Sequence, residues 1–139
     1  MDFATITFIL AILIVGVFVF LAILWTGRRG HHFNIEYYQV HFLEIENKLR
    51  KENPTSYSLA VINADKLLDH ALTEAGIAGK TMGDRLKHCG TKFTDLNTVW
   101  RAHKLRNCLA HEPDFEISYQ QAKNALEIYK QALKDLGAI

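Results

Sequence analysis

The feature that most constrains this chain is an unbroken apolar run near its start. Residues Phe3 to Trp25 include no charged residue, proline, asparagine or glutamine, and Val, Ile, Leu and Phe dominate the run. As an α-helix, these 23 residues at about 1.5 Å each extend about 35 Å, slightly more than the ~30 Å hydrocarbon core of a bilayer. The sequence therefore predicts a transmembrane helix over residues 3–25, in contact with membrane lipid.

The residues beside this run set its expected orientation. Trp25 suits a membrane interface, and Arg28 and Arg29 follow in a polar juxtamembrane linker over residues 26–34. Arginines favour the cytoplasmic side of a span. We therefore predict a single-pass protein of the inner or plasma membrane, with its N-terminus outside and its C-terminal domain in the cytoplasm. A cleaved secretory signal is the alternative, but it needs a basic start, a shorter apolar core and small residues at a cleavage site, whereas this run follows Asp2.

Nearly all the charge lies after the apolar run. The whole chain is 49% hydrophobic and 22% charged, and its formal net charge is +1. This composition excludes an acidic disordered chain and argues against binding nucleic acid through net charge alone. Two cysteines, Cys89 and Cys108, cannot form a disulfide framework, so we expect a reducing compartment.

Apolar residues beyond the linker recur three and four positions apart, which is the spacing of one helix face. The first such series is Ile35, Tyr38, Phe42, Ile45 and Leu49. A second runs from Ala60 to Ala75, and the last runs from Tyr119 through Tyr129 to Leu136. No stretch alternates with the two-residue period of a strand. The predicted helices cover residues 35–49, 57–75, a short segment from Thr81 that ends before Gly90, 94–109, and 118–136. Residues 35–139 are therefore predicted to form an all-α bundle of four main helices and a short one.

The sequence has residues typical of a phosphate-binding loop and of a zinc site, but neither pattern is complete. Gly79-Lys80-Thr81 resembles the end of a phosphate-binding loop, but that pattern needs a glycine where this chain has Glu74, and a preceding strand. The candidate metal ligands are single, widely spaced residues, namely His88, Cys89, His103, Cys108 and His111. Zinc sites need closely paired ligands, so we expect no metal and no cofactor.

One helical segment carries polar residues where its pattern calls for apolar ones. Arg106 falls inside the apolar arc of helix 94–109, and His103 and Asn107 lie on the same arc. An unpaired buried guanidinium costs several kcal/mol, so Arg106 needs an anion, a subunit interface or a carboxylate. Asp65 and Asp69 are candidates to orient it, unless they are exposed helix carboxylates that pair with Lys66 or water. Alternatively, the stem of Arg106 lies on the core with its charge in water.

His111 follows Arg106 by five residues, which on an unbroken helix separates the two side chains by about 140°. A helix break before Pro113 would swing the imidazole back toward Arg106. Alternatively, the two groups meet across a twofold dimer. Arginine and histidine together suit phosphodiester cleavage, because arginine stabilises the phosphate while histidine transfers a proton. We therefore predict Arg106, Asn107 and His111 as catalytic residues, with Asn107 orienting the other two.

The middle of the domain has a local excess of positive charge, carried by Lys80, Arg85, Lys87, Lys92, Arg101 and Lys104. Such a run is either a solvated face or a surface for RNA. We predict Arg101, Lys104 and His103 as substrate-binding residues. Trp100 either joins the core or lines a cleft beside them.

Three stretches of the sequence together resemble a HEPN-superfamily domain, and the resemblance covers about residues 35–138. They are Ala64 to Asp69, Thr81 to Leu86, and Val99 to Glu112, in the helix order of that family. The resemblance implies a helical bundle that is commonly dimeric, with an arginine, a polar residue and a histidine in an R-x(4–6)-H motif. In active members this motif cleaves RNA without a metal at a composite dimer cleft, whereas inactive members bind nucleotides or only dimerise. Arg106, Asn107 and His111 occupy the three motif positions.

The leading hypothesis from the sequence is a homodimeric, membrane-anchored HEPN-like domain that acts as a metal-independent endoribonuclease in stress, defence or a toxin–antitoxin system. The alternative is a non-catalytic module that dimerises at the membrane and recruits a protein partner or a nucleotide. A third hypothesis is the antitoxin-like or regulatory half of a two-gene system.

Overall fold

A computed structural model describes residues 3–26 and 32–139, with side chains described for 3–22 and 32–139. The chain divides into two compact units, of which the second is Phe33–Ile139. Each unit is described by itself. The predicted linker arginines, Arg28 and Arg29, lie outside the described residues, as does the side chain of Trp25.

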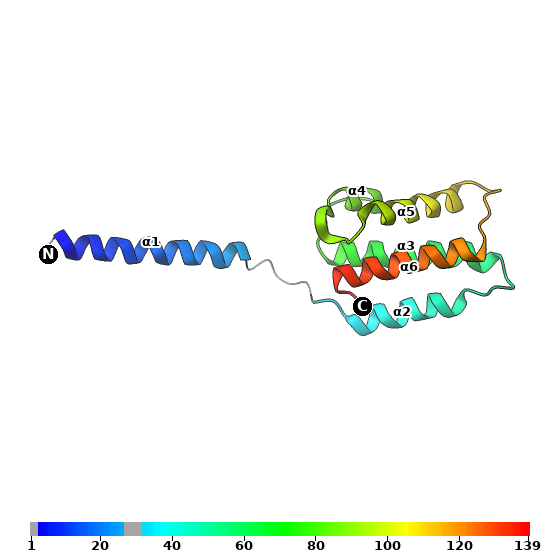
Figure 1. The fold of residues 1–139 in the computed structure, drawn as a ribbon, viewed down its shortest axis with the longest axis horizontal. Helices are drawn as coiled ribbons and strands as arrows, with labels where there is room; N and C mark the ends of the chain where they lie inside the picture. Colours follow the sequence, from blue (N-terminus) through cyan, green and yellow to red (C-terminus); the bar gives the residue numbers. More distant parts are fainter. Residues whose placement is uncertain (1–2, 27–31) are drawn as a thin grey trace. The chain divides into compact units, whose positions relative to one another are not determined.

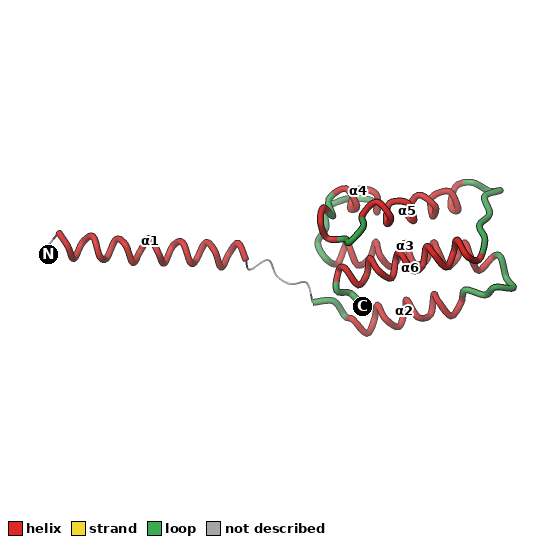
Figure 2. The backbone as a smooth tube through the Cα atoms, in the orientation of Figure 1, coloured by secondary structure: helices red, strands yellow, loops and turns green. Residues whose placement is uncertain are grey.

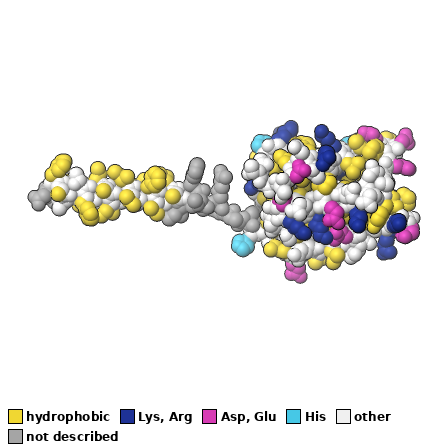
Figure 3. All heavy atoms as spheres, in the orientation of Figure 1, with side chains coloured by type: hydrophobic (Ala, Val, Ile, Leu, Met, Phe, Trp, Pro, Cys, Tyr) yellow, Lys and Arg dark blue, Asp and Glu magenta, His cyan; other side chains and the backbone are white. Residues whose placement is uncertain are grey.

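The first unit contains helix α1 (Phe3–Thr26). Its segment Phe3–Ala22 has a mean hydropathy of 2.9 and no buried side chain. Figure 3 shows apolar side chains along residues 3–22 of this helix and no charged side chain among them. By length and composition, α1 can cross a membrane.

The second unit is built from helices alone over residues 32–139 (Figure 2). Its elements are α2 (Ile35–Lys48), α3 (Thr55–Glu74), α4 (Met82–Lys87), the 3-10 helix η1 (Gly90–Lys92), α5 (Leu96–His111) and α6 (Tyr119–Leu136). The predicted all-α class, with four long helices and a short one in this unit, is confirmed. The turn η1 was not predicted.

The four long helices surround a core centred on α3, which contacts α2, α5 and α6. Figure 1 shows α3 and α6 in the middle, with α2 on one side and α4 and α5 on the other. The largest fully buried side chains come from α2, α3, α4 and α6 and from the residue after α4's cap: Tyr38, Tyr129, Phe42, Leu68, Leu72, Leu86, Leu133, Val61 and Cys89. Packing of these apolar faces supplies most of the stability of such helices.

Side-chain caps explain where the helices begin. The hydroxyl of Thr81 accepts a hydrogen bond from the backbone N–H of Asp84, as the sequence predicts. Ser118 and Gln121 form a reciprocal capping box at α6. Each cap satisfies backbone N–H groups that the helix itself leaves without partners.

Three sequence expectations need correction. Ile35 was assigned to the inward face of α2, yet it is 49% exposed in the first turn. Ala75 was expected inside as well, but it caps α3 and is partly exposed. Helix α5 begins at Leu96 rather than at residue 94, because Asp95 caps it through the N–H of Thr98.

Candidate functional site

The centre of the candidate site is the buried carboxylate of Asp65 on α3, which is 3% exposed. Its Oδ1 atom accepts a hydrogen bond from the hydroxyl of Tyr129 at 3.0 Å and lies 2.8 Å from Nδ1 of His103. Its Oδ2 atom lies 3.4 Å from Nε of Arg106. One carboxylate therefore joins α3, α5 and α6. Asp65 is therefore the carboxylate that pairs with Arg106, although Nε of Arg106 makes no hydrogen bond to it.

Asp69 has a different partner. It accepts a hydrogen bond at 2.9 Å from Arg85, a side chain only 12% exposed. Arg85 was predicted as part of an exposed basic surface, and that assignment is wrong because its charge is paired beneath the surface. The two aspartates lie one helical turn apart, so each receives its own arginine.

Polar contacts continue from Arg106 to His103 through Asn107. A terminal nitrogen of Arg106 donates to the side-chain oxygen of Asn107 at 3.0 Å. The amide nitrogen of Asn107 lies 3.3 Å from Nε2 of His103. Asn107 thus bridges the guanidinium of Arg106 and the imidazole of His103.

An open pocket of about 730 Å³ lies above these residues, between α3, α4 and α5. Its carboxylates each have a cationic partner, in the pairs Asp65–Arg106, Asp69–Arg85 and Asp84–Lys87. Lys66 and Lys104 also line the pocket and have no carboxylate partner among residues 32–139. This charge balance favours an anionic ligand.

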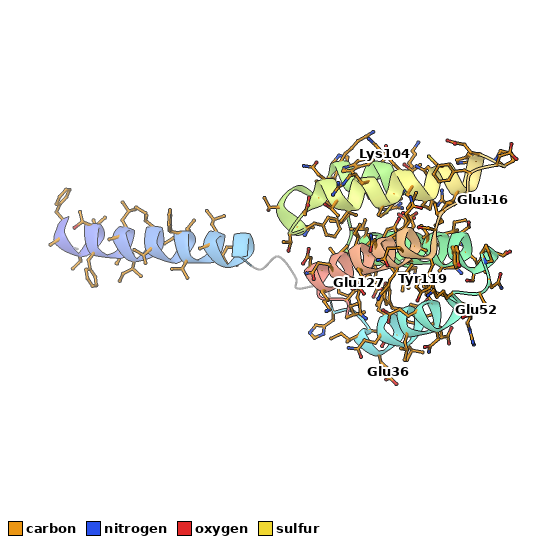
Figure 4. All side chains as sticks on the ribbon, turned by 45° about the vertical axis from the view of Figure 1, so that its right-hand side comes forward. Glu36, Glu52, Lys104, Glu116, Tyr119 and Glu127 are labelled. Atoms are coloured by element: carbon orange, nitrogen blue, oxygen red, sulfur yellow. The ribbon has the colours of Figure 1, made fainter. Side chains whose placement is uncertain are left out.

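The predicted substrate-binding residues separate into two groups. His103 and Lys104 line the pocket, and Lys104 points away from the bundle on the outer side of α5 (Figure 4). Arg101 is exposed, donates to the hydroxyl of Thr98 and is not part of the pocket lining. Trp100 is half-buried on the pocket wall, edge-on to His103 with ring centroids 6.1 Å apart. It therefore lines the pocket as well as packing against the core.

His111 lies apart from the other predicted catalytic residues. It is the exposed last residue of α5 and makes no side-chain hydrogen bond or ion pair within residues 32–139. The helix does break before Pro113, but the break comes after His111 and leaves that residue on α5. Proline restricts the residue that precedes it, so the helix ends at Glu112, whose backbone is extended. Within one protomer, His111 and Arg106 therefore remain on different sides of α5.

Tyr129, Lys66 and Gly83 complete the site but were not singled out from the sequence as site residues. Tyr129 was assigned to the core by its spacing on α6, and its ring is indeed fully buried. Gly83 lies at the pocket wall, where an added Cβ would come within 3.6–3.8 Å of Trp100 and His103. A tyrosine on an apolar face needs a partner for its hydroxyl, and this was the signal available for Tyr129.

Because the Tyr129 hydroxyl is buried, we expect the free energy of unfolding to depend on pH in the alkaline range. Burial, together with the neighbouring Asp65 charge, raises the pKa of Tyr129 above its ordinary value of 10. Above pH 10 the unfolded chain loses this proton while the folded chain keeps it, so the free energy of unfolding falls as pH rises. The slope of stability against pH will be about 1.4 kcal/mol per pH unit shallower in Tyr129→Phe than in the wild type between pH 10 and 12. Urea unfolding at a series of pH values measures both slopes, and parallel slopes would contradict the assignment.

Together these contacts define one candidate site on three helices. Asp65 holds His103 and Arg106 at the floor of an open pocket, and unpaired lysines lie at its rim. Such a set can bind an anion and transfer a proton. No family model matches this sequence, and the comparisons with curated proteins and with solved structures find no match.

Proposed function

We propose that residues 33–139 form a HEPN-like domain that cleaves RNA without a metal, held by α1 at the cytoplasmic face of a membrane. The observation that carries this proposal is the position of Arg106. The carboxylate of Asp65 lies beside Nε of Arg106, and the guanidinium lines a pocket together with Lys66 and Lys104, which have no carboxylate partner among residues 32–139. A guanidinium held this way is ready to bind a phosphodiester and to stabilise its developing charge.

The proposed active form is a homodimer in which one protomer supplies Arg106 and Asn107 and the second copy supplies His111. Support comes from α5, which continues through His111 and keeps that imidazole about 140° from Arg106 around the helix axis. A twofold axis would bring each His111 to the other copy's pocket. The exposed His111 then exchanges a proton at the scissile phosphate.

The test is cleavage of a labelled single-stranded RNA by the full chain in detergent micelles containing EDTA. The wild type will release fragments with 2′,3′-cyclic phosphate ends. His111→Ala will reduce the rate by about 10²–10⁴-fold, the range that acid–base catalysis contributes. Arg106→Ala will reduce it by about 10²–10³-fold, as expected for the loss of a group that stabilises developing charge. His88→Gln is the matched control, because His88 is exposed and lies outside the pocket.

Mixing the two inactive variants tests the composite site directly. A heterodimer of Arg106→Ala with His111→Ala keeps one complete site of two. Random association at equal concentrations will therefore restore about one quarter of the wild-type activity. Activity that does not return in a mixture shown to contain heterodimers would contradict a site shared between protomers.

The second candidate function is a non-catalytic nucleotide-binding and dimerisation module at the membrane. The exposure of His111 and its distance from the pocket favour this alternative. A folded wild-type dimer that binds a mononucleotide but leaves RNA intact would establish it.

A further inference from the structure

Among the histidines of residues 32–139, His103 is the one that combines a buried acidic partner with a place in the pocket lining. Its side chain is 9% exposed, and its Nδ1 atom lies 2.8 Å from Asp65 Oδ1. A carboxylate accepts hydrogen bonds, so in the neutral ring the proton is on Nδ1 and Nε2 carries the lone pair that accepts a proton. The carboxylate of Asp65 also accepts a hydrogen bond from the hydroxyl of Tyr129 and lies beside Arg106. These two contacts hold the carboxylate in place, and the carboxylate in turn orients the imidazole of His103.

The Nε2 atom of His103 faces the pocket side of α5. Asn107 Nδ2 lies 3.3 Å from it and donates a weak hydrogen bond. On α4, Gly83 has no side chain to cover it, and an added Cβ would stand 3.8 Å from Nε2. A ligand that enters between Gly83 and Asn107 reaches Nε2 by displacing this weak contact with the amide of Asn107.

The same pocket contains Nε2 of His103 and the guanidinium of Arg106, the proposed phosphate-binding group. Asn107 accepts from Arg106 at 3.0 Å while its amide nitrogen contacts His103, so one amide separates the guanidinium from the imidazole. A phosphodiester bound by Arg106 would therefore have its neighbouring ribose beside Nε2. The other histidines among residues 32–139 differ: His32, His41, His70, His88 and His111 do not line this pocket.

We propose that His103 is the general base of the RNA cleavage, an inference that rests on the proposed function. Nε2 takes the proton from a ribose 2′-hydroxyl, and the 2′-oxygen forms a bond to phosphorus. The bond from phosphorus to the 5′-oxygen breaks, which leaves a 2′,3′-cyclic phosphate. The departing 5′-oxygen takes a proton from His111 of the second copy. Asp65 stabilises the imidazolium that forms, and the substrate is single-stranded RNA with a free 2′-hydroxyl.

A substrate with sulfur in place of the bridging 5′-oxygen separates the two histidines. A thiolate leaves without protonation, so a variant that lacks the general acid regains activity on this substrate, while one that lacks the general base does not. We expect His111→Ala and His103→Gln each to lose about 10²–10⁴-fold on ordinary RNA. On the sulfur substrate, His111→Ala will recover to within about tenfold of the wild type and His103→Gln will stay inactive. His88→Gln will match the wild type on both.

The outcomes distinguish the role of His103 as general base from the proposed RNA cleavage itself. If the wild type does not cleave RNA, the proposed function fails and this role fails with it. If the wild type cleaves while His103→Gln remains active on ordinary RNA, or recovers on the sulfur substrate, the base assignment alone is overturned.

Folding of the variant is checked separately. His103→Gln must bind an uncleavable 2′-deoxy dinucleotide within a few-fold of the wild-type affinity. If it does not fold, the wild type in micelles is titrated with that dinucleotide while its imidazole nitrogens are followed by NMR. A shift of the His103 Nε2 signal supports the proposal, and an unchanged signal at saturating ligand overturns it.

Discussion

Replacing Asp65 with alanine will lower the free energy of unfolding by about 3 kcal/mol. The change leaves the imidazole of His103, the Arg106 guanidinium and the Tyr129 hydroxyl without their shared acceptor. Removing one partner of a buried charge pair costs about 3–5 kcal/mol. We expect the lower end because the Arg106 side chain is 30% exposed and regains water.

The measurement is urea unfolding of the full chain in micelles, followed by circular dichroism. Asp114→Ala is the control, because Asp114 is exposed in the loop between α5 and α6. A surface change of this kind alters stability by less than about 0.5 kcal/mol. Equal losses in the two variants would show that Asp65 does not hold the three helices together.

Leu68→Ala will produce a loss of similar or greater size, about 2–5 kcal/mol. Leu68 is fully buried on α3, the helix that contacts α2, α5 and α6. Truncation removes apolar contacts and leaves a cavity that packed helices fill only in part. The midpoint of urea unfolding will fall with little change in its slope.

Leu59→Ala is the matched control on the same helix. Leu59 is 54% exposed near the start of α3, and alanine is the stronger helix former. Its stability will stay within about 0.5 kcal/mol of the wild type. A loss equal to that of Leu68→Ala would mean that this outer face of α3 is buried against something else.

The helices were predictable because their signals are local. The three-and-four spacing marks the buried face of each long helix, and the caps at Thr81 and Ser118 use residues within one turn. The end of α6 follows from Gly137, whose φ of 75° suits glycine. The end of α5 differed by two residues, since Pro113 restricts Glu112 and not the residues before it.

The site was predictable as a set of residues but not as an arrangement. Asp65 and Asp69 lie four residues apart on one face of α3, so the sequence offered both as partners for Arg106. The choice depends on how α3 packs against α5, and on Arg85, which takes Asp69. The alignment of α3 with α5 depends on how their side chains pack together, and a local sequence pattern does not predict this packing.

The contact between Tyr129 and Asp65 was missed for a related reason. Tyr129 is 64 residues from Asp65 in the chain, and its place in the apolar series of α6 describes only its ring. The role of His111 stays a prediction, because His111 lies at the end of α5 and does not line the pocket of its own chain.

Because Gly83 has no side chain, the residue at this position determines how much space the pocket has in front of His103. A methyl group would make ordinary contact with Trp100 at 3.6 Å, whereas a branched side chain would fill the space in front of His103. Gly83 belongs to a six-residue helix that supplies none of the groups bonded to Asp65. The size of ligand that the chain accepts can therefore change through one position, while the buried network that holds the bundle together stays the same.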